Sequence, residues 1–242
     1  MPTIVIASPK GGAGKTTAAV ILATEFARAG ASVTLLDCDP NHSATLWWSK
    51  GIRPSGIEVL SDVSDSTVVR TIKEHDRDGG VVICDLEGIA SRLVSRAISQ
   101  ADLVLTPMRA TTLDATIGIR TVALVQEEEE ALDRPIRHAV FFTMTRAIRS
   151  RQHLGIQKSF AEQGIAIVNP PLMERAAYSA LFQFGGDLHS MPAQGAMGNA
   201  RENARLFAEA VFAQLVSTRE TNNEQRQSIR HSGRSAKKEP QE

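Results

Sequence analysis

Short, mainly apolar runs alternate with longer amphipathic segments along this 242-residue chain. The runs at 3–7, 32–36, 80–85, 102–107 and 137–143 contain few polar residues, which is typical of strands buried on both faces of a parallel sheet. The segments between them carry apolar residues at helical spacing and are often bounded by Gly or Pro. The pattern therefore predicts an α/β fold, with a doubly wound, mostly parallel sheet flanked by helices.

The apolar pattern stops well before the end of the chain. Its last element is a predicted helix over 199–216, after which Gln, Asn, Ser, Arg and Glu replace apolar residues. We expect one domain at 1–216, a size that can bury a sizeable core, and a polar, disordered tail at 217–242. Lys plus Arg and Asp plus Glu both number 27, so any DNA contact must use a local basic patch rather than the net charge.

Cysteine usage and hydropathy indicate the cellular compartment in which the protein works. The two cysteines, Cys38 and Cys84, have no clustered His partners, which argues against a disulfide framework or a metal site and fits a reducing cytosol. Both lie beside aspartates at predicted strand ends, and we interpret them as small buried residues rather than as a redox switch. The sequence shows neither a signal-peptide pattern nor an apolar stretch of about 18 residues. We expect a cytoplasmic protein without a membrane span.

The most specific motif is a glycine-rich loop between the first predicted strand and the first predicted helix. It reads Lys10-Gly11-Gly12-Ala13-Gly14-Lys15-Thr16-Thr17. Glycines let backbone N–H groups converge on phosphate oxygens, and a helix N-terminus adds positive potential. In such a loop Lys15 contacts the β- and γ-phosphates, and the Thr16 hydroxyl binds Mg²⁺. Pro9 stands where the standard pattern has its first glycine, and Lys10 adds a second lysine.

This departure resembles the deviant Walker A motif of the ParA/MinD family of ATPases. The resemblance covers residues 1–216 and implies a P-loop NTPase fold that binds ATP and Mg²⁺. It implies a slow, partner-stimulated ATPase that forms a homodimer with ATP sandwiched at the interface. In that dimer Lys10 reaches the partner's ATP, residues 11–17 surround the phosphates, and the catalytic candidates are Lys10, Lys15 and Asp39.

Acidic residues follow or end the second and third of these predicted strands. Asp37-Cys38-Asp39-Pro40 follows one strand, and Asp85 ends another. Acids at the carboxyl edge of a sheet, beside a phosphate loop, are placed for metal or water chemistry. The first run resembles the family's second motif, in which Asp39 orients the attacking water, while Asp37 is either structural or in the outer shell of the metal. Asp85 is expected to hold Mg²⁺ through water, so the metal candidates are Thr16, Asp39 and Asp85.

Later strand ends supply candidates for the base and for DNA. The resemblance places Thr145 and Arg146 against the adenine, and Asn169-Pro170 turns the chain at another strand end where a base can lie. The DNA-binding candidates are Arg149, Arg151 and Arg175. Asp114 begins a predicted helix at the expected dimer face, where it either serves that interface or simply caps the helix.

The resemblance also implies a task. The ATP-bound dimer binds DNA non-specifically, a ParB-like or other partner protein stimulates hydrolysis, and the cycle segregates or positions a plasmid, chromosome region or other cargo on the nucleoid. Three alternatives share the phosphate loop. They are a DNA-transfer accessory ATPase that binds a specific DNA site, a MinD-like ATPase on a membrane surface, and a metabolic P-loop enzyme. The residues after 216 lack the apolar face that membrane binding needs.

Overall fold

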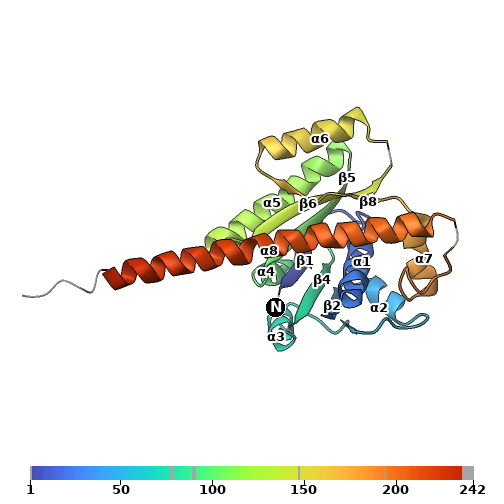
Figure 1. Ribbon diagram of the computed structural model, residues 1–242, viewed down its shortest axis with the longest axis horizontal. Helices are drawn as coiled ribbons and strands as arrows, with labels where there is room; N and C mark the ends of the chain where they lie inside the picture. The colour runs from blue at the N-terminus through green and yellow to red at the C-terminus, as the bar shows by residue number, and fades with distance from the viewer. Residues whose placement is uncertain (1, 77–78, 89–90, 147, 194, 236–242) are drawn as a thin grey trace, which may run out of the picture.

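The computed structural model describes residues 2–76, 79–88, 91–146, 148–193 and 195–235, the last 19 by their backbone alone (Figure 1). Its centre is an eight-stranded sheet in the order β3-β2-β4-β1-β5-β6-β7, with β8 also beside β6. Every pairing is parallel, which confirms the predicted fold class. The strands are β1 Thr3–Ile6, β2 Ser32–Cys38, β3 Ile57–Leu60, β4 Gly80–Leu86, β5 Leu103–Arg109, β6 Arg137–Thr145, β7 Ala166–Ile167 and β8 Leu172–Met173.

Helices cover both faces of the sheet, which explains the nearly unbroken apolar strands. Ile4 and Ile6 of β1 pack with the helices of one face, whereas Val5 packs with those of the other, because successive side chains of a strand point in opposite directions. The first face carries α1 Lys15–Arg28, α2 Ser43–Trp48, α7 Ala176–Phe184 and α8 Met197–Ser235. The second carries α3 Val68–Glu74, α4 Arg92–Ile98, α5 Thr112–Leu132 and α6 Arg151–Glu162.

The strand order places the phosphate loop at the middle of the sheet. β1 lies between β4 and β5, although the chain passes from β1 to β2 on one side and later crosses to β5 on the other. In open α/β sheets ligands bind outside the carboxyl ends of the strands at such a switch point. The loop at 10–17 leaves β1 at this edge and enters α1.

The last helix is longer than its apolar pattern predicted. We expected it to end at residue 216, but α8 continues to Ser235 (Figure 1). The sequence contains neither Gly nor Pro from 199 to 232, so no strong helix breaker stops it where the apolar pattern stops. The expected end is therefore wrong. The domain boundary at 216 stays a prediction, and 236–242 lie outside the described residues.

A histidine between two central strands gives the fold a pH dependence. His138 Nε2 on β6 lies 2.9 Å from Thr106 Oγ1 on β5, and burial lowers the pKa of His138 to about 4. Because the unfolded histidine has a higher pKa, near 6.5, only the unfolded chain takes up this proton between the two values. We expect stability to fall by roughly 2–3 kcal/mol as the pH drops from 6.5 to 4, measured by urea denaturation. His138→Gln should flatten this part of the profile, and an equally steep loss in that variant would contradict the assignment.

Candidate nucleotide-binding site

The phosphate loop has a backbone that only glycine adopts easily. Gly12 and Gly14 have φ of 67° and 95°, in the left-handed region where a side chain is strained. Gly14 is the residue before α1, and Lys15 is the first residue of that helix. Gly11 and Gly12 are exposed, whereas Lys15 is buried to 7% exposure. The loop therefore presents an open row of backbone groups above the helix N-terminus, with a buried cation at its end.

A threonine on β6 holds the phosphate loop through a hydrogen bond. The Thr143 hydroxyl donates a 2.8 Å hydrogen bond to the carbonyl of Ala13. A Cβ on Gly14 would lie 3.2 Å from Thr143 Cγ2, so the loop packs closely against the strand. The sequence analysis did not predict this contact with the loop, because a threonine inside an apolar strand carries no motif. Its one signal was its place beside Thr145, at the carboxyl end of the strand.

Thr143→Val tests this support with a nearly isosteric change. The variant leaves the Ala13 carbonyl without its bond, which costs about 1–2 kcal/mol and should weaken ATP binding roughly tenfold. Thr121→Val is the matched control, because the Thr121 hydroxyl is also buried but has no hydrogen-bond partner within the described part of the chain. Calorimetric titration with ATP should separate the two variants. Equal affinities would show that Thr143 does not hold the loop.

Asp85 is a buried carboxylate at the end of β4. Both of its oxygens are enclosed, and neither accepts a hydrogen bond from any described residue. Burial is the largest cause that raises the pKa of Asp85, to about 7. The Thr16 side chain and the positive charge of Lys15 oppose this rise, whereas the negative charges of Asp37 and Asp39 add to it. Thr16 thus faces the carboxylate without reaching ordinary hydrogen-bond geometry. A buried carboxylate without donors is costly unless a cation compensates it, so this residue set fits a hydrated Mg²⁺.

The two acids at the end of β2 differ in their surroundings. Asp37 is fully buried, and its Oδ2 accepts bonds of 2.7 Å from both the backbone N–H and the hydroxyl of Thr45. It thereby caps α2 from β2, whereas its Oδ1 is buried without a hydrogen-bond partner among the described residues, so a structural role and a place in the outer shell of the metal both stay open for Asp37. Asp39 is partly exposed, and its Oδ1 accepts bonds from the N–H and the side-chain amide of Asn41. Asp39 therefore lies at the edge of the site, where its negative charge helps to raise the pKa of Asp85.

Lys10 is held by the chain's own Asp114. Its ammonium contacts Asp114 Oδ1, with side-chain exposures of 35% for Lys10 and 1% for Asp114. The second oxygen of Asp114 accepts the Arg109 N–H at 3.2 Å, and the Asp114 N–H is capped by the Thr111 hydroxyl. Asp114 is therefore more than a helix cap, because it fixes the second lysine of the loop beside the N-terminus of α5.

The predicted base-binding residues meet at the end of β6. β8 pairs with β6 at Thr143 and Thr145, and this pairing brings the segment that follows Asn169-Pro170 alongside Thr145. The short strand β8 was missed, because the two adjacent prolines predicted only a turn. The Thr145 hydroxyl is buried without a described partner, whereas Arg146 and Asn169 are exposed and Pro170 is partly exposed. An unpaired hydroxyl beside exposed polar side chains is compatible with a base-binding edge.

Comparison with known proteins decides the family. The family model described as the CobQ/CobB/MinD/ParA nucleotide binding domain matches residues 4–229. The chain belongs to this family. A protein named ParA from Rhizobium radiobacter is 61% identical over 218 residues, which cover 89% of this chain and 98% of that protein. The predicted membership in the ParA/MinD family of ATPases is thereby confirmed.

Solved structures show how widely this ParA/MinD-family fold is shared. Apo McdA of Cyanothece matches with a TM-score of 0.72 and 21% identity, covering 87% of this chain and 99% of that one. Cobyrinic acid a,c-diamide synthase from Mycobacterium smegmatis, solved with an ATP analog and magnesium, matches with a TM-score of 0.66 and 15% identity over 90% and 97% of the two chains. At these identities the likeness establishes the fold alone.

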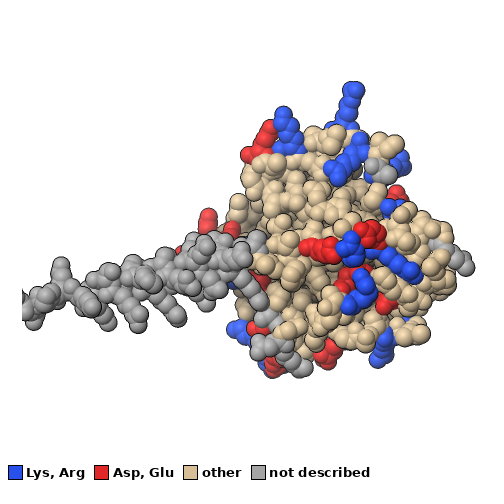
Figure 2. All heavy atoms as spheres, in the orientation of Figure 1, with Lys and Arg blue, Asp and Glu red and all other residues tan. Residues whose placement is uncertain are grey.

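The three DNA-binding candidates of this family member do not form one cluster. Arg149 and Arg151 are exposed at the start of α6, and Figure 2 shows basic side chains gathered over this helix. Arg175 precedes α7 instead, and it is partly buried: its Nη2 lies 3.3 Å from Met173 Sδ, and its Nε has no described partner. The structure therefore brings Arg149 and Arg151 together and leaves Arg175 apart.

Other sequence-based expectations concern groups near or outside the site. Both cysteines are buried; burial raises the pKa of Cys38 to about 12 and that of Cys84 well above its ordinary value. Thiols that stay protonated react slowly, which supports small buried residues over a redox switch. The described residues contain no group of three or more His, Cys, Asp or Glu side chains able to hold a metal ion. Among the same residues, none of the helices is both long and apolar enough to cross a membrane.

Proposed function

We propose that the protein is a Mg²⁺-dependent ATPase that dimerises around ATP, binds DNA non-specifically, and segregates or positions a plasmid, chromosome region or other cargo. The observation that carries this proposal is the 61% identity over 89% of the chain to a protein named ParA. The site supports it, because the loop has two lysines in different surroundings, one buried at the helix N-terminus and one paired with an acid outside it.

In this proposal, different residues of the chain bind the phosphates, the metal ion, the attacking water and the base. The N–H groups of residues 11–17 and the Lys15 ammonium bind the phosphate oxygens and hold them in place. Thr16 and Asp85 would hold Mg²⁺, with Asp39 at the rim; when bound, this ion neutralises charge that develops on the phosphates. Asp39 orients the attacking water from its exposed side. Thr145, Arg146, Asn169 and Pro170 hold the base.

Dimerisation requires Lys10 to change partners. In the monomer its charge is neutralised by Asp114. In the proposed dimer, Lys10 contacts the phosphates bound by the partner subunit and stabilises the charge of the transition state. The dimer then doubles each basic surface, so that a DNA contact too weak in one subunit becomes adequate in two. A ParB-like or other partner protein stimulates hydrolysis and releases the dimer from the nucleoid, which places the cycle in a prokaryotic cytoplasm.

A metabolic P-loop enzyme is the second candidate, because such an enzyme would share the phosphate loop. Such an enzyme needs a small-molecule acceptor for the phosphoryl group. ATP turnover that depends on a small substrate, and that is indifferent to DNA, would select it over the partition ATPase.

The arginines before and within α6 provide the test of the DNA surface. We expect Arg149→Glu combined with Arg151→Glu to weaken DNA binding about tenfold or more, with a smaller salt dependence, because phosphate contacts are lost. ATP-dependent dimerisation should remain. Arg70→Glu is the matched control on α3, where Arg70 is exposed and lies 3.6 Å from Glu74. DNA binding that survives the double substitution would move the surface elsewhere, with Arg175 and α8 as the next segments to test.

A further inference from the structure

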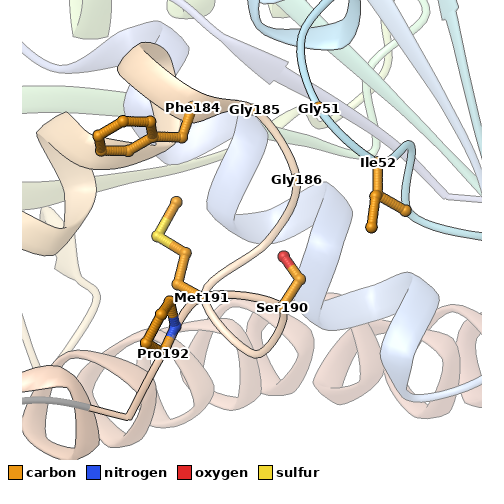
Figure 3. Close-up of a pocket in the computed structure, with 8 residues that line it drawn as sticks. All are labelled: Gly51, Ile52, Phe184, Gly185, Gly186, Ser190, Met191 and Pro192. Atoms are coloured by element: carbon orange, nitrogen blue, oxygen red, sulfur yellow. The ribbon is translucent and has the colours of Figure 1, made fainter.

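An apolar pocket of about 490 Å³ lies between the turn after α2 and the loop after α7. Ile52, Phe184 and Met191 line it, and Figure 3 shows the Met191 side chain extending toward Phe184, with Ile52 beyond the Gly185-Gly186 backbone. The pocket lies at the end of α2 away from the turn that carries Asp39. It is therefore distinct from the phosphate loop.

The floor of this pocket is formed by two backbone turns in direct contact. A Cβ on Gly51 would lie 2.5 Å from the Phe184 carbonyl, and one on Gly185 would collide with the Lys50 carbonyl. Both glycines have positive φ, so no other residue fits either position without strain. The buried Trp47 indole N–H also donates a 2.9 Å bond to the Gly186 carbonyl. The hollow is thus held open by the fold before anything enters it.

Large apolar side chains in the walls of the pocket are exposed to solvent. Ile52 is 80% exposed and Phe184 is 60% exposed. Single exposed apolar residues are ordinary, but exposed apolar residues gathered around a preformed hollow mark a binding surface. The volume suits one or two side chains of a peptide rather than a second folded domain.

Basic residues adjoin the segments that line the pocket. Arg53 lies over the Trp48 ring at 5.3 Å, and Lys50 donates to the Phe182 carbonyl. Arg201 is bonded to the Leu188 and Met191 carbonyls. The nearby acid, Asp187, already accepts bonds from the N–H groups of the loop that follows it. The apolar walls are therefore flanked by cations next to Gly51, Ile52 and Met191, a combination that favours carboxylates around an apolar anchor.

The geometry points to a docking pocket for a peptide segment of a partner protein, in which one or two large apolar side chains are flanked by Asp or Glu. α2 spans only about 9 Å between this pocket and the turn of Asp39. Its first turn is bonded to Asp37 and its last turn to Gly186. A peptide seated in the pocket thus lies one short helix away from the turn that carries the candidate water-orienting acid. This inference goes beyond the proposed function, because peptide binding requires neither ATP nor DNA.

The experiment uses the full chain and a random nine-residue peptide library displayed on phage. Selected peptides should share apolar residues flanked by acids, and a synthetic consensus peptide should bind in a fluorescence anisotropy titration. Ile52→Asp and Arg53→Glu should each weaken this binding about tenfold or more. Ile148→Asp is the matched control, because Ile148 is 90% exposed and lies before α6.

Each outcome supports or overturns the docking pocket without any measurement of ATP hydrolysis. Acidic, apolar peptides whose binding fails in Ile52→Asp but survives in Ile148→Asp establish the pocket, even if DNA binding is never observed. No enriched peptide, peptides without acids, or peptides indifferent to Ile52→Asp would overturn it. Far-ultraviolet circular dichroism confirms that each variant is folded, as expected for exposed positions.

Discussion

Replacing Lys15 with alanine should abolish nucleotide binding, with a loss of affinity of about a hundredfold or more. Lys15 is buried at the first position of α1, beside the loop that we propose binds the phosphates. The substitution removes the buried cation of this loop, and the other lysine, Lys10, is paired with Asp114 instead. Calorimetric titration with ATP and Mg²⁺ measures the effect.

A control variant must show whether the loss of any lysine charge, even an exposed one, weakens ATP binding. Lys158→Ala removes an exposed lysine of α6 and should leave ATP affinity unchanged. The Lys15 substitution also takes away a charge that lowers the pKa of Asp85, so Asp85 should titrate at a still higher pH in the variant. Normal ATP affinity in Lys15→Ala would refute the assignment of the loop as the phosphate site.

Replacing Lys10 with alanine should separate binding from dimerisation. Lys10 lies outside the buried part of the loop and pairs with Asp114, so ATP affinity of the monomer should change by no more than about threefold. The ATP-dependent dimer should be lost, because the charge that we propose reaches the partner's phosphates is gone. Light scattering of the purified variant with ATP and Mg²⁺ gives the mass directly.

Asp114→Asn is the matched partner of this variant. It keeps the shape of the side chain and removes the charge that holds Lys10 in the monomer. We expect it to dimerise at a lower ATP concentration than the natural chain, provided that the cap of α5 by Thr111 is kept. A Lys10→Ala protein that dimerises normally would contradict the role of Lys10, whatever the behaviour of Asp114→Asn.

The sequence predicted those parts of the fold and site that follow from local chemistry. β1 at Thr3–Ile6 and β4 at Gly80–Leu86 match the expected positions, because short apolar runs determine them locally. The acids at the ends of β2 and β4 meet beside the loop, since parallel strands bring their carboxyl ends to one edge. The repeated strand–helix order is therefore sufficient to place Asp39 and Asp85 near Lys15.

What the sequence did not predict depends on contacts between distant residues. Thr143 bonds to Ala13 across 130 positions, and Lys10 pairs with Asp114 across 104; neither pair has a local pattern. Arg175 has the sequence of an exposed arginine, yet its Nε is buried by tertiary packing. The pocket beside Ile52 likewise needs two glycine turns, 134 residues apart, to touch. Such contacts become visible only when the chain is folded.

The most direct test of the central claim is DNA binding by the purified protein without nucleotide, with ADP, and with ATP plus Mg²⁺. The mass is measured in parallel, and each state is followed over a salt series with several unrelated DNA sequences. The account predicts that ATP with Mg²⁺ alone produces a dimer that binds all of these sequences, with affinity falling steeply as salt rises. A dimer that forms with ATP and does not bind DNA would contradict it, and the surface would then serve a membrane, a protein scaffold or a small substrate.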